Sequence, residues 1–396
     1  MAGLYIHIPF CQSRCIYCDF FSTTCTHRME AYVGAVTREL ELRRHYLPHT
    51  GARPLLHTVY IGGGTPSLLP TPLLYRLFEG IARWYDIAPQ AEVTIEANPD
   101  DVHDPWIAAL HHTPVNRVSL GIQSFDDPTL RLLNRRHNAQ QAVGAVRRLQ
   151  EAGIADISID LMYGLPGQTA EQWKADLHTA LALAPTHLSA YALIYEEHTR
   201  LWTMRQRGEV AEADEQLSLH MYSLLMDTLA QAGYEHYEIS NFALPGHRAR
   251  HNSSYWQGVP YIGCGAAAHS YDGSNRQWNC SDLEEYIGGV MGCTSQQAAA
   301  HGTWVTHERL TDDERYNDLI ITALRTADGL DVAALRQRFG QARASYCLKA
   351  ARPHIEAGRL TLTDGKEQPA SGLLRLTRQG LFLSDGVMSD LLYVED

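Results

Sequence analysis

The stretch LYIHIPFCQSRCIYCDF occupies residues 4–20 and runs from a predicted strand directly into three cysteines. Apolar and polar side chains alternate over 4–10, which is typical of a β-strand with one buried face. Cys11, Cys15 and Cys18 follow, with three and then two residues between them. Structural zinc sites and most iron–sulfur clusters use four protein ligands, so this set is one ligand short. The stretch predicts a metal centre on the loop after the first strand.

Three kinds of site fit so close a run of cysteines. A disulfide is least favoured, because eight cysteines in 396 residues do not make a disulfide scaffold and the N-terminus carries no secretory signal. A zinc site needs a fourth ligand, for which Asp19, Cys25 or His27 is available. A cubane cluster held by three thiolates leaves one iron open for chemistry. The spacing favours the cluster and leaves zinc as the alternative.

Strand and helix patterns alternate through the first half of the chain. Predicted strands lie at 4–10, 57–66, 91–100, 115–126, 154–167 and 186–197. Helical periodicity between them is clearest at 29–44, 139–153 and 170–184. Six repeats of strand and helix predict an α/β fold with a parallel sheet, either open or curled into a barrel.

Distinctive polar or glycine residues stand at the ends of these strands. GGGTP (62–66) ends the second, Glu96 lies near the end of the third, and Gln123 and Asp160 follow on the fourth and fifth. In α/β barrels the carboxyl ends of the strands carry the active site. We therefore expect these residues and the cysteines to lie together at the carboxyl end of the barrel.

The pattern changes after residue 200. A long helix is predicted at 214–233, followed by a segment rich in Tyr, His, Gly and Asn at 234–271. From 308–326 onward the sequence indicates helices, and the tail at 373–392 indicates a short strand or ribbon and a helix. We expect two domains, divided as 1–295 for the barrel and 308–396 for a small, mostly helical module.

Composition limits the classes of partner and location. The formal net charge is −12, and the 33 basic residues form no Lys/Arg-rich block, which disfavours nucleic acid as a partner. No window of about 18 apolar residues free of charge predicts a spanning helix. With no signal peptide, the expected location is cytoplasmic.

The cysteine spacing C-x3-C-x2-C, with Tyr17 beside it, resembles the signature of the radical SAM superfamily. The resemblance implies a [4Fe–4S] cluster on Cys11, Cys15 and Cys18, with S-adenosylmethionine (SAM) on the open iron. It also implies reductive cleavage of SAM to a 5′-deoxyadenosyl radical and a partial (β/α)6-type barrel. Further motifs resemble the oxygen-independent coproporphyrinogen III oxidase branch: YIHIPFC (5–11), GGGTPS (62–67), IEANP (95–99), LGIQSF (120–125) and IDLMYGLPGQT (159–169).

The same resemblance implies roles around SAM. Gly63, Gly64 and Thr65 would let the backbone approach the methionine end, where a bulkier residue would clash. Glu96 would accept hydrogen bonds from the ribose hydroxyls. Arg135 would pair with the SAM carboxylate, unless it is a solvated helix residue in the polar segment around it. The pocket would be completed by Gln123 and Asp160 as lining residues and by Tyr5 and Tyr17 as walls of the cluster and adenosine.

Two departures separate this sequence from the oxidases. They carry a fourth cysteine two residues after the third, where this chain has Phe20, and a longer segment ahead of the cluster. HNSSYW (251–256) is similar to the haem-binding motif of the HemW haem chaperones, relatives that lack the fourth cysteine. This implies His251 as a ligand of haem iron, with Tyr255 and Trp256 stacked on the porphyrin. The alternative is a structural loop.

The resemblance therefore implies a haem chaperone that binds a cluster, SAM and haem. It also implies transfer of haem to respiratory proteins, cluster-dependent dimerisation and peripheral membrane contact. Two alternatives stay open: coproporphyrinogen III dehydrogenase, which Phe20 disfavours, and a zinc-binding structural protein. The remaining cysteines receive no role, and the default for the last four is a small buried hydrophobe: Cys25, Cys264, Cys280, Cys293 and Cys347.

Overall fold

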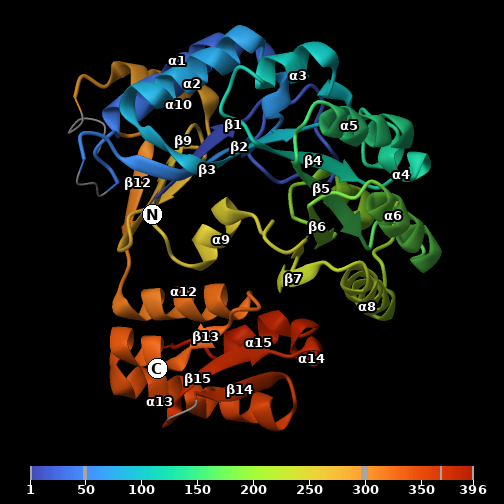
Figure 1. Cartoon of the computed structure of the whole chain (residues 1–396), viewed down its shortest axis with the longest axis vertical. Helices are drawn as coiled ribbons and strands as arrows, with labels where there is room; N and C mark the ends of the chain where they lie inside the picture. Colours follow the sequence, from blue (N-terminus) through green and yellow to red (C-terminus); the bar gives the residue numbers. More distant parts are fainter. Residues whose placement is uncertain (1, 48–50, 296–301, 366–367, 395–396) are drawn as a thin grey trace.

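Two sheets and the helices around them make up the computed structural model, which describes residues 2–47, 51–295, 302–365 and 368–394 (Figure 1). Within these residues the larger sheet has twelve strands, in the order β12-β11-β10-β9-β1-β2-β3-β4-β5-β6-β8-β7. The smaller sheet has three described strands, in the order β13-β15-β14. The larger sheet curves around the short helix α9 (Arg250–Trp256).

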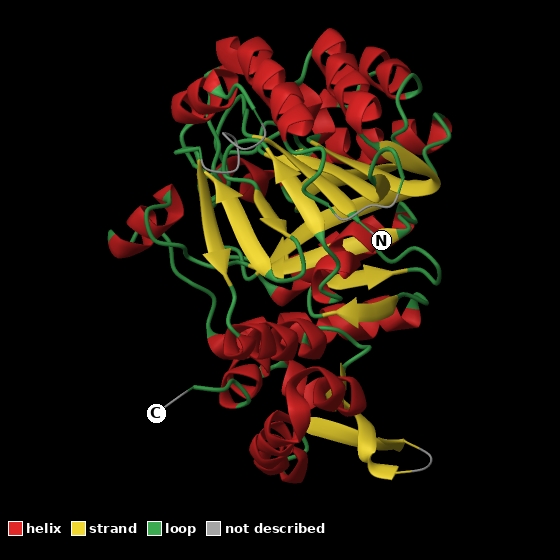
Figure 2. Ribbon diagram, turned by 90° about the vertical axis from the view of Figure 1, so that its left-hand side faces the viewer, coloured by secondary structure: helices red, strands yellow, loops and turns green. Residues whose placement is uncertain are grey.

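Strands β1 to β6 are parallel neighbours in chain order. Their bounds are Gly3–Ile8, Leu55–Gly63, Asp86–Ala97, Arg117–Gln123, Asp156–Tyr163 and His187–Ala192. Helices cover the convex face of the sheet (Figures 1 and 2): α1 (Met29–Leu42), α2 (Thr71–Trp84), α3 (Asp104–Leu110), α4 (Asp127–Leu132), α5 (Ala139–Glu151) and α6 (Ala170–Ala182). The expected partial (β/α)6 barrel is confirmed.

The alternation along each strand separates the two faces of the sheet. On β1, Leu4, Ile6 and Ile8 are fully buried in the main core, whereas Tyr5 and His7 point the other way. The same pattern recurs on the next strands, so the concave face is lined by polar and aromatic side chains. Branched aliphatic side chains fill the interior of many closed barrels, whereas polar and aromatic side chains face the concave side of this sheet.

The sheet is wider than the sequence predicted. Six further strands extend it: β7 (Glu235–Glu238), β8 (Asn241–Ala243), β9 (Tyr261–Cys264), β10 (His269–Tyr271), β11 (Asn275–Asn279) and β12 (Val305–Arg309). β9 is parallel to β1, and the other five pair antiparallel. All six have three to five residues, too short for a period of two to stand out in the sequence.

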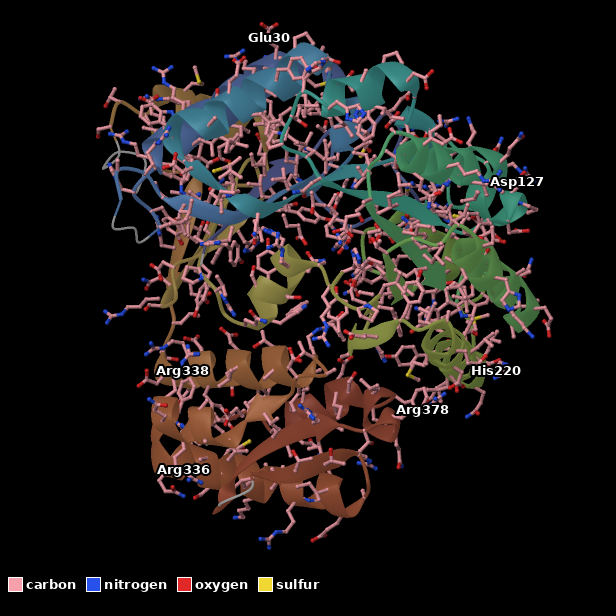
Figure 3. All side chains as sticks on the ribbon, viewed as in Figure 1. Glu30, Asp127, His220, Arg336, Arg338 and Arg378 are labelled. Atoms are coloured by element: carbon pink, nitrogen blue, oxygen red, sulfur yellow. The ribbon has the colours of Figure 1, made fainter. Side chains whose placement is uncertain are left out.

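The remaining connections are short helices and the long helix after β6. They are η1 (Thr26–Arg28), η2 (Pro66–Leu68), η3 (Pro99–Asp101), α7 (Arg200–Gln206), α8 (Glu215–Gln231) and α10 (Leu283–Gly292). Charged side chains such as Glu30 on α1 and Asp127 on α4 point outward from these layers (Figure 3).

The C-terminal module has its own hydrophobic core. It contains α12 (Asp312–Leu324), β13 (Leu330–Asp331), α13 (Val332–Glu356, broken at Gly340), β14 (Leu360–Gly365), β15 (Gln368–Leu376), α14 (Arg378–Leu381) and α15 (Ser384–Asp390). It is mostly helical, with a small antiparallel sheet. Since β12 still pairs with β11 of the main sheet, we propose a domain boundary between Arg309 and Asp312. Arg378 ties the module to α8 through Asp227 (Figure 3).

Candidate functional site

The three cysteines lie on the loop after β1, at the carboxyl end of the parallel strands. Cys11 is buried, while Cys15 and Cys18 are half-buried. The Thr65 hydroxyl donates to Cys11 Sγ over 3.6 Å, and Arg135 Nη1 donates to Cys15 Sγ over 3.1 Å. Burial raises the pKa of the Cys11 thiol and raises that of Cys18 to about 11. A bound metal centre would lower these pKa values again, since a coordinated thiol loses its proton.

The glycines at the end of β2 are required by close packing within the protein. Gly63 has a φ of +114°, and a Cβ there would lie 2.7 Å from the ring of His7. A Cβ at Gly64 would lie 2.8 Å from the backbone carbon of Pro9. The sequence attributed these glycines to the approach of SAM. The structure shows a second reason, which is that any side chain would push β2 away from the cysteine loop.

Glu96 lies at the end of β3 with its carboxylate fixed by two donors. The Tyr60 hydroxyl donates to Oε1 over 2.7 Å, and the backbone N–H of Gly63 donates to Oε2 over 3.0 Å. Burial raises the pKa of Glu96 to about 7, despite the hydrogen bond from Tyr60. The carboxylate therefore changes charge near neutral pH and faces the glycine turn.

Arg135 points into the site and not into solvent. Its Nη2 donates to Asn98 Oδ1 over 2.8 Å and to the carbonyl of Gly121, in addition to the contact with Cys15. The alternative of a solvated helix residue is therefore wrong. Its Nε is buried without a hydrogen-bond partner among the described residues. An unpartnered guanidinium N–H beside the cysteines fits an incoming carboxylate.

Gln123 and Asp160 lie on strands of the sheet, whereas Tyr17 lies on the cysteine loop. Gln123 ends β4 with a φ of +73°, where the pairing with β5 shifts register. Asp160 on β5 accepts from the Ser119 hydroxyl over 3.2 Å, and burial raises the pKa of its carboxyl to about 6. Tyr17 lies against the apolar cluster around Ile16 beside the cysteines.

An aromatic stack runs from Tyr5 to the predicted haem ligand. Tyr5 stacks on Tyr60 with ring centroids 6.1 Å apart, and Tyr60 stacks on His251 at 5.2 Å. His251 is 1% exposed. Its Nδ1 lies 2.8 Å from Thr58 Oγ1. Thr58 is five residues before Gly63 on β2, about 16 Å along the strand, so His251 contacts the end of β2 that is far from the cysteines.

HNSSYW forms helix α9, whereas the structural alternative was a loop. The Glu92 carboxylate on β3 accepts from the backbone N–H groups of Arg250 and His251, each over 2.8 Å, and so holds the start of the helix. Tyr255 OH lies 2.7 Å from His251 Nε2. Trp256 faces the opposite side, beneath the guanidinium of Arg325 on the C-terminal module.

The structure therefore separates the predicted haem residues. His251 and Tyr255 point into the barrel, and Trp256 lies at the seam with the C-terminal module. In this arrangement the three side chains do not share one face of α9. The predicted cluster and SAM residues, by contrast, gather at the carboxyl end of the strands, except for Tyr5, which lies within β1 beside Tyr60.

Sequence reasoning missed several residues of the concave face. These are His7, Thr58, Tyr60, Glu92, Asn98 and Ser119. The available signal was the period of two along each strand, since the missed strand residues alternate with buried aliphatic ones. Asn98 follows β3 and had no such signal. Among the unassigned cysteines, Cys264 and Cys347 are buried, Cys280 and Cys293 are half-buried, and Cys25 is exposed.

Comparisons with known proteins agree with this geometry. The family model described as the Radical SAM superfamily matches residues 5–180, and that of the HemN C-terminal domain matches 310–383. The protein named Heme chaperone HemW from Lactococcus lactis is 37% identical over 336 residues, covering 85% of this chain and 84% of its own. The chain belongs to the HemW family of radical SAM proteins. Another protein of that name, from Mycobacterium tuberculosis, is 34% identical and covers 98% of this chain and 94% of its own.

The fold of this HemW-family chain matches that of a solved coproporphyrinogen III oxidase. The Escherichia coli enzyme HemN, described as a radical SAM enzyme, aligns with a TM-score of 0.82 at 23% identity and covers 98% of this chain and 89% of its own. At that identity the match shows the fold alone. Membership of the radical SAM superfamily implies a [4Fe–4S] cluster and SAM, and the thiols and the unpartnered Arg135 Nε fit them. It therefore favours the cluster over the zinc alternative.

We expect SAM binding to weaken in acid because of Glu96. An ionised carboxylate accepts hydrogen bonds from ribose hydroxyls at both oxygens, whereas protonation turns one oxygen into a donor and makes the other a weaker acceptor. With a pKa of about 7, SAM should bind about tenfold more weakly at pH 6 than at pH 8. The measurement is equilibrium dialysis of SAM with cluster-loaded protein. Glu96→Gln should bind more weakly at pH 8 and lack this dependence. Identical pH profiles for the two proteins would contradict the assignment.

Proposed function

We propose that this chain is a radical SAM haem chaperone, which binds haem and passes it to other proteins. The observation that carries the proposal is the set of relatives named Heme chaperone HemW, 34–37% identical over most of this chain. The barrel supports it because the cysteines, Arg135 and Glu96 lie together at the carboxyl end of the strands.

The residues in place suit the cofactors that the superfamily implies. Cys11, Cys15 and Cys18 would hold the cluster. Arg135 would orient the SAM carboxylate, and Glu96 would accept from its ribose hydroxyls. When bound, the cluster and SAM supply one-electron reduction at the open iron. The chain itself contributes charge neutralisation at Arg135, a fixed acceptor at Glu96 and a rigid turn at Gly63.

Phe20 argues against coproporphyrinogen decarboxylation as the activity. It stands where the oxidases have a fourth cysteine, and it is 65% exposed beside the cysteine loop. A phenyl ring binds no iron and carries no thiol chemistry. The chain therefore has the fold of the oxidases but not their fourth cysteine.

The proposal also covers the proteins that accept haem and the location of the chain in the cell. We propose respiratory haem proteins as acceptors, dimerisation that depends on the cluster, peripheral contact with a membrane and a cytoplasmic location. None of the described helices combines the length and apolar character needed to cross a bilayer. The formal charge of −12 also favours a protein partner over nucleic acid.

Two assays on one anaerobically reconstituted sample test the function. We expect a haem titration, followed by optical absorbance, to saturate at about one haem per chain. We expect no loss of carboxyl groups from coproporphyrinogen III when SAM and a reductant are supplied. Decarboxylation without haem binding would place the chain with the oxidases and refute the chaperone proposal.

His251→Ala should weaken haem binding and leave the cluster intact. If the imidazole ligates the haem iron, the substitution removes the iron–nitrogen bond. We therefore expect at least a tenfold rise in the Kd for haem. His187→Ala is a matched control, because His187 is equally buried between two hydroxyls, those of Ser158 and Tyr237. Equal titrations for wild type and His251→Ala would remove His251 as the ligand.

A further inference from the structure

The two ring nitrogens of His251 meet two different surroundings. Nδ1 faces the sheet: Thr58 Oγ1 lies 2.8 Å away, and a Cβ placed on Gly3 would lie only 3.5 Å from it. Nε2 faces the side chain of Tyr255, one turn further along α9, whose hydroxyl lies 2.7 Å away. A planar ligand as large as haem therefore reaches this imidazole only from the Nε2 side.

The chemistry of imidazole ligands assigns a role to each hydroxyl. Iron binds the ring nitrogen that carries no proton, and a partner of the other N–H fixes the tautomer and raises ligand basicity. The Thr58 hydroxyl accepts from Nδ1–H in the tautomer that leaves Nε2 bare. In that tautomer the Tyr255 hydroxyl donates to Nε2 and occupies the lone pair that iron needs.

We propose that Thr58 is a positioning residue which prepares His251 to bind haem iron through Nε2, and that Tyr255 is the group which the iron displaces. The inference rests on the proposed haem-binding function. In this arrangement the Tyr255 hydroxyl competes with iron for Nε2 of His251. The sequence motif had instead implied that the Tyr255 ring stacks on the porphyrin.

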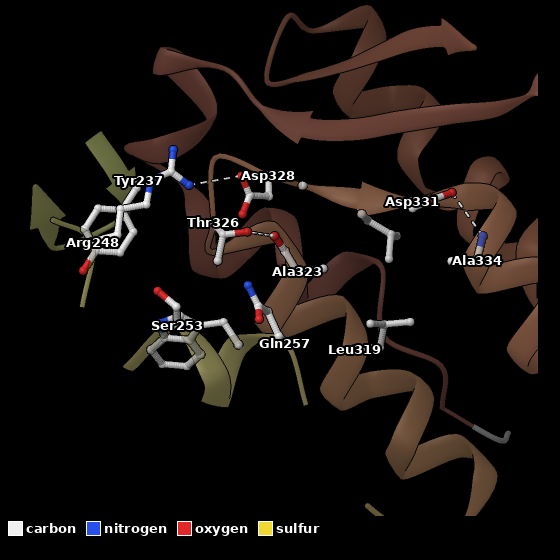
Figure 4. A pocket seen from close by; sticks show the side chains of 13 residues that line it. Tyr237, Arg248, Ser253, Gln257, Leu319, Ala323, Thr326, Asp328, Asp331 and Ala334 are labelled. Atoms are coloured by element: carbon white, nitrogen blue, oxygen red, sulfur yellow. Dashed lines mark hydrogen bonds and ion pairs between the residues drawn. The ribbon is translucent and has the colours of Figure 1, made fainter. Parts of the chain in front are cut away.

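The contacts of α9 show what must move. Glu92 holds the first turn of the helix at Arg250 and His251, so that end stays close to the sheet. The last turn borders a cavity of about 310 Å³ between α9 and the C-terminal module, lined in part by Ser253 and Gln257 (Figure 4). Neither His251 nor Tyr255 lines this cavity, so we infer that Tyr255 leaves Nε2 by a movement of the last turn of α9 toward it.

The experiment compares five variants of the full chain, reconstituted with its cluster and titrated with ferric haem, one of them His251→Ala. Tyr255→Phe removes the competing hydroxyl, and we expect haem to bind about 3- to 10-fold more tightly. Thr58→Val removes the acceptor of Nδ1–H, and we expect binding about 10- to 100-fold weaker. The matched controls are Thr94→Val, a buried threonine elsewhere on the concave face, and Tyr261→Phe, whose ring packs edge-on against Tyr255. Both controls should bind haem as the wild type does.

Opposite shifts for Tyr255→Phe and Thr58→Val, with a histidine-ligand optical and electron paramagnetic resonance signature that His251→Ala lacks, would support the inference. Weaker binding in both variants, or in the controls as well, would mean a structural role and would overturn it. Unchanged haem binding in both variants would overturn it and leave the chaperone function standing. Failure of the wild type to bind haem would refute the proposed function itself. Thermal melting and iron content of each variant confirm that the fold and cluster are present.

Discussion

Cys15→Ala is expected to abolish the iron–sulfur cluster. A cubane on three thiolates has no spare protein ligand, so the loss of one sulfur leaves two irons without a protein ligand. Iron should fall from about four atoms per chain to near zero after anaerobic reconstitution, with loss of the broad visible absorbance. SAM binding should fall with it, because the open iron is lost. Iron analysis and absorbance on the same sample measure the effect.

The fold should survive this substitution. Cys15 is half-buried on a loop, outside the buried core residues of the barrel, and alanine fits wherever the thiol does. Cys25→Ala is the matched control: it removes an exposed thiol from the same segment, just before η1, and should retain the full iron content. Retention of iron by Cys15→Ala together with loss from Cys25→Ala would show that the ligand set is wrong.

Glu39→Leu is expected to destabilise the barrel by about 3–5 kcal/mol. Glu39 on α1 is 0% exposed and forms an ion pair with Arg43 at 2.9 Å. It also accepts from the backbone N–H of Gly265, from Asn279 and from the hydroxyl of Tyr286, so it joins α1 to the β9–β11 side of the sheet and to α10. Leucine would leave the buried guanidinium without its carboxylate, with the Gly263 carbonyl and the Ser270 hydroxyl as remaining acceptors. It would also remove the acceptor of the Gly265 N–H and of the Tyr286 hydroxyl.

Chemical denaturation followed by circular dichroism measures this effect at the first unfolding transition. Glu41→Leu is the control on the same helix, since its ion pair with Arg38 is partly exposed and should contribute less than about 1 kcal/mol. The double variant Glu39→Leu/Arg43→Met should recover part of the loss, because it removes the unpaired charge as well. Equal stability of Glu39→Leu and Glu41→Leu would contradict the importance of the buried network.

Some features followed from the sequence because they depend on local order. The cysteine spacing and the strand-end motifs predicted the barrel, the family and the gathering of Glu96, Gln123 and Asp160 at one end, since parallel strands bring their carboxyl ends together. The long helices were predicted nearly to their ends. For example, 170–184 corresponds to Ala170–Ala182, whose capping box is visible in the sequence as Thr169 and Gln172.

Other features depended on contacts between residues far apart in the chain. The short strands that widen the sheet exist only because β1 and β6 offer edges to pair with. The orientation of Arg135 is set by Asn98 and Gly121, on two other strand ends. The environment of His251 is set by Thr58, which is 193 residues away along the chain. No local sequence pattern predicts a contact over such a separation. The sequence by itself determined which chemistry this protein carries. Only the tertiary structure decided which side chains face one another, because hydrogen bonds and burial depend on distance in space and not on distance along the chain.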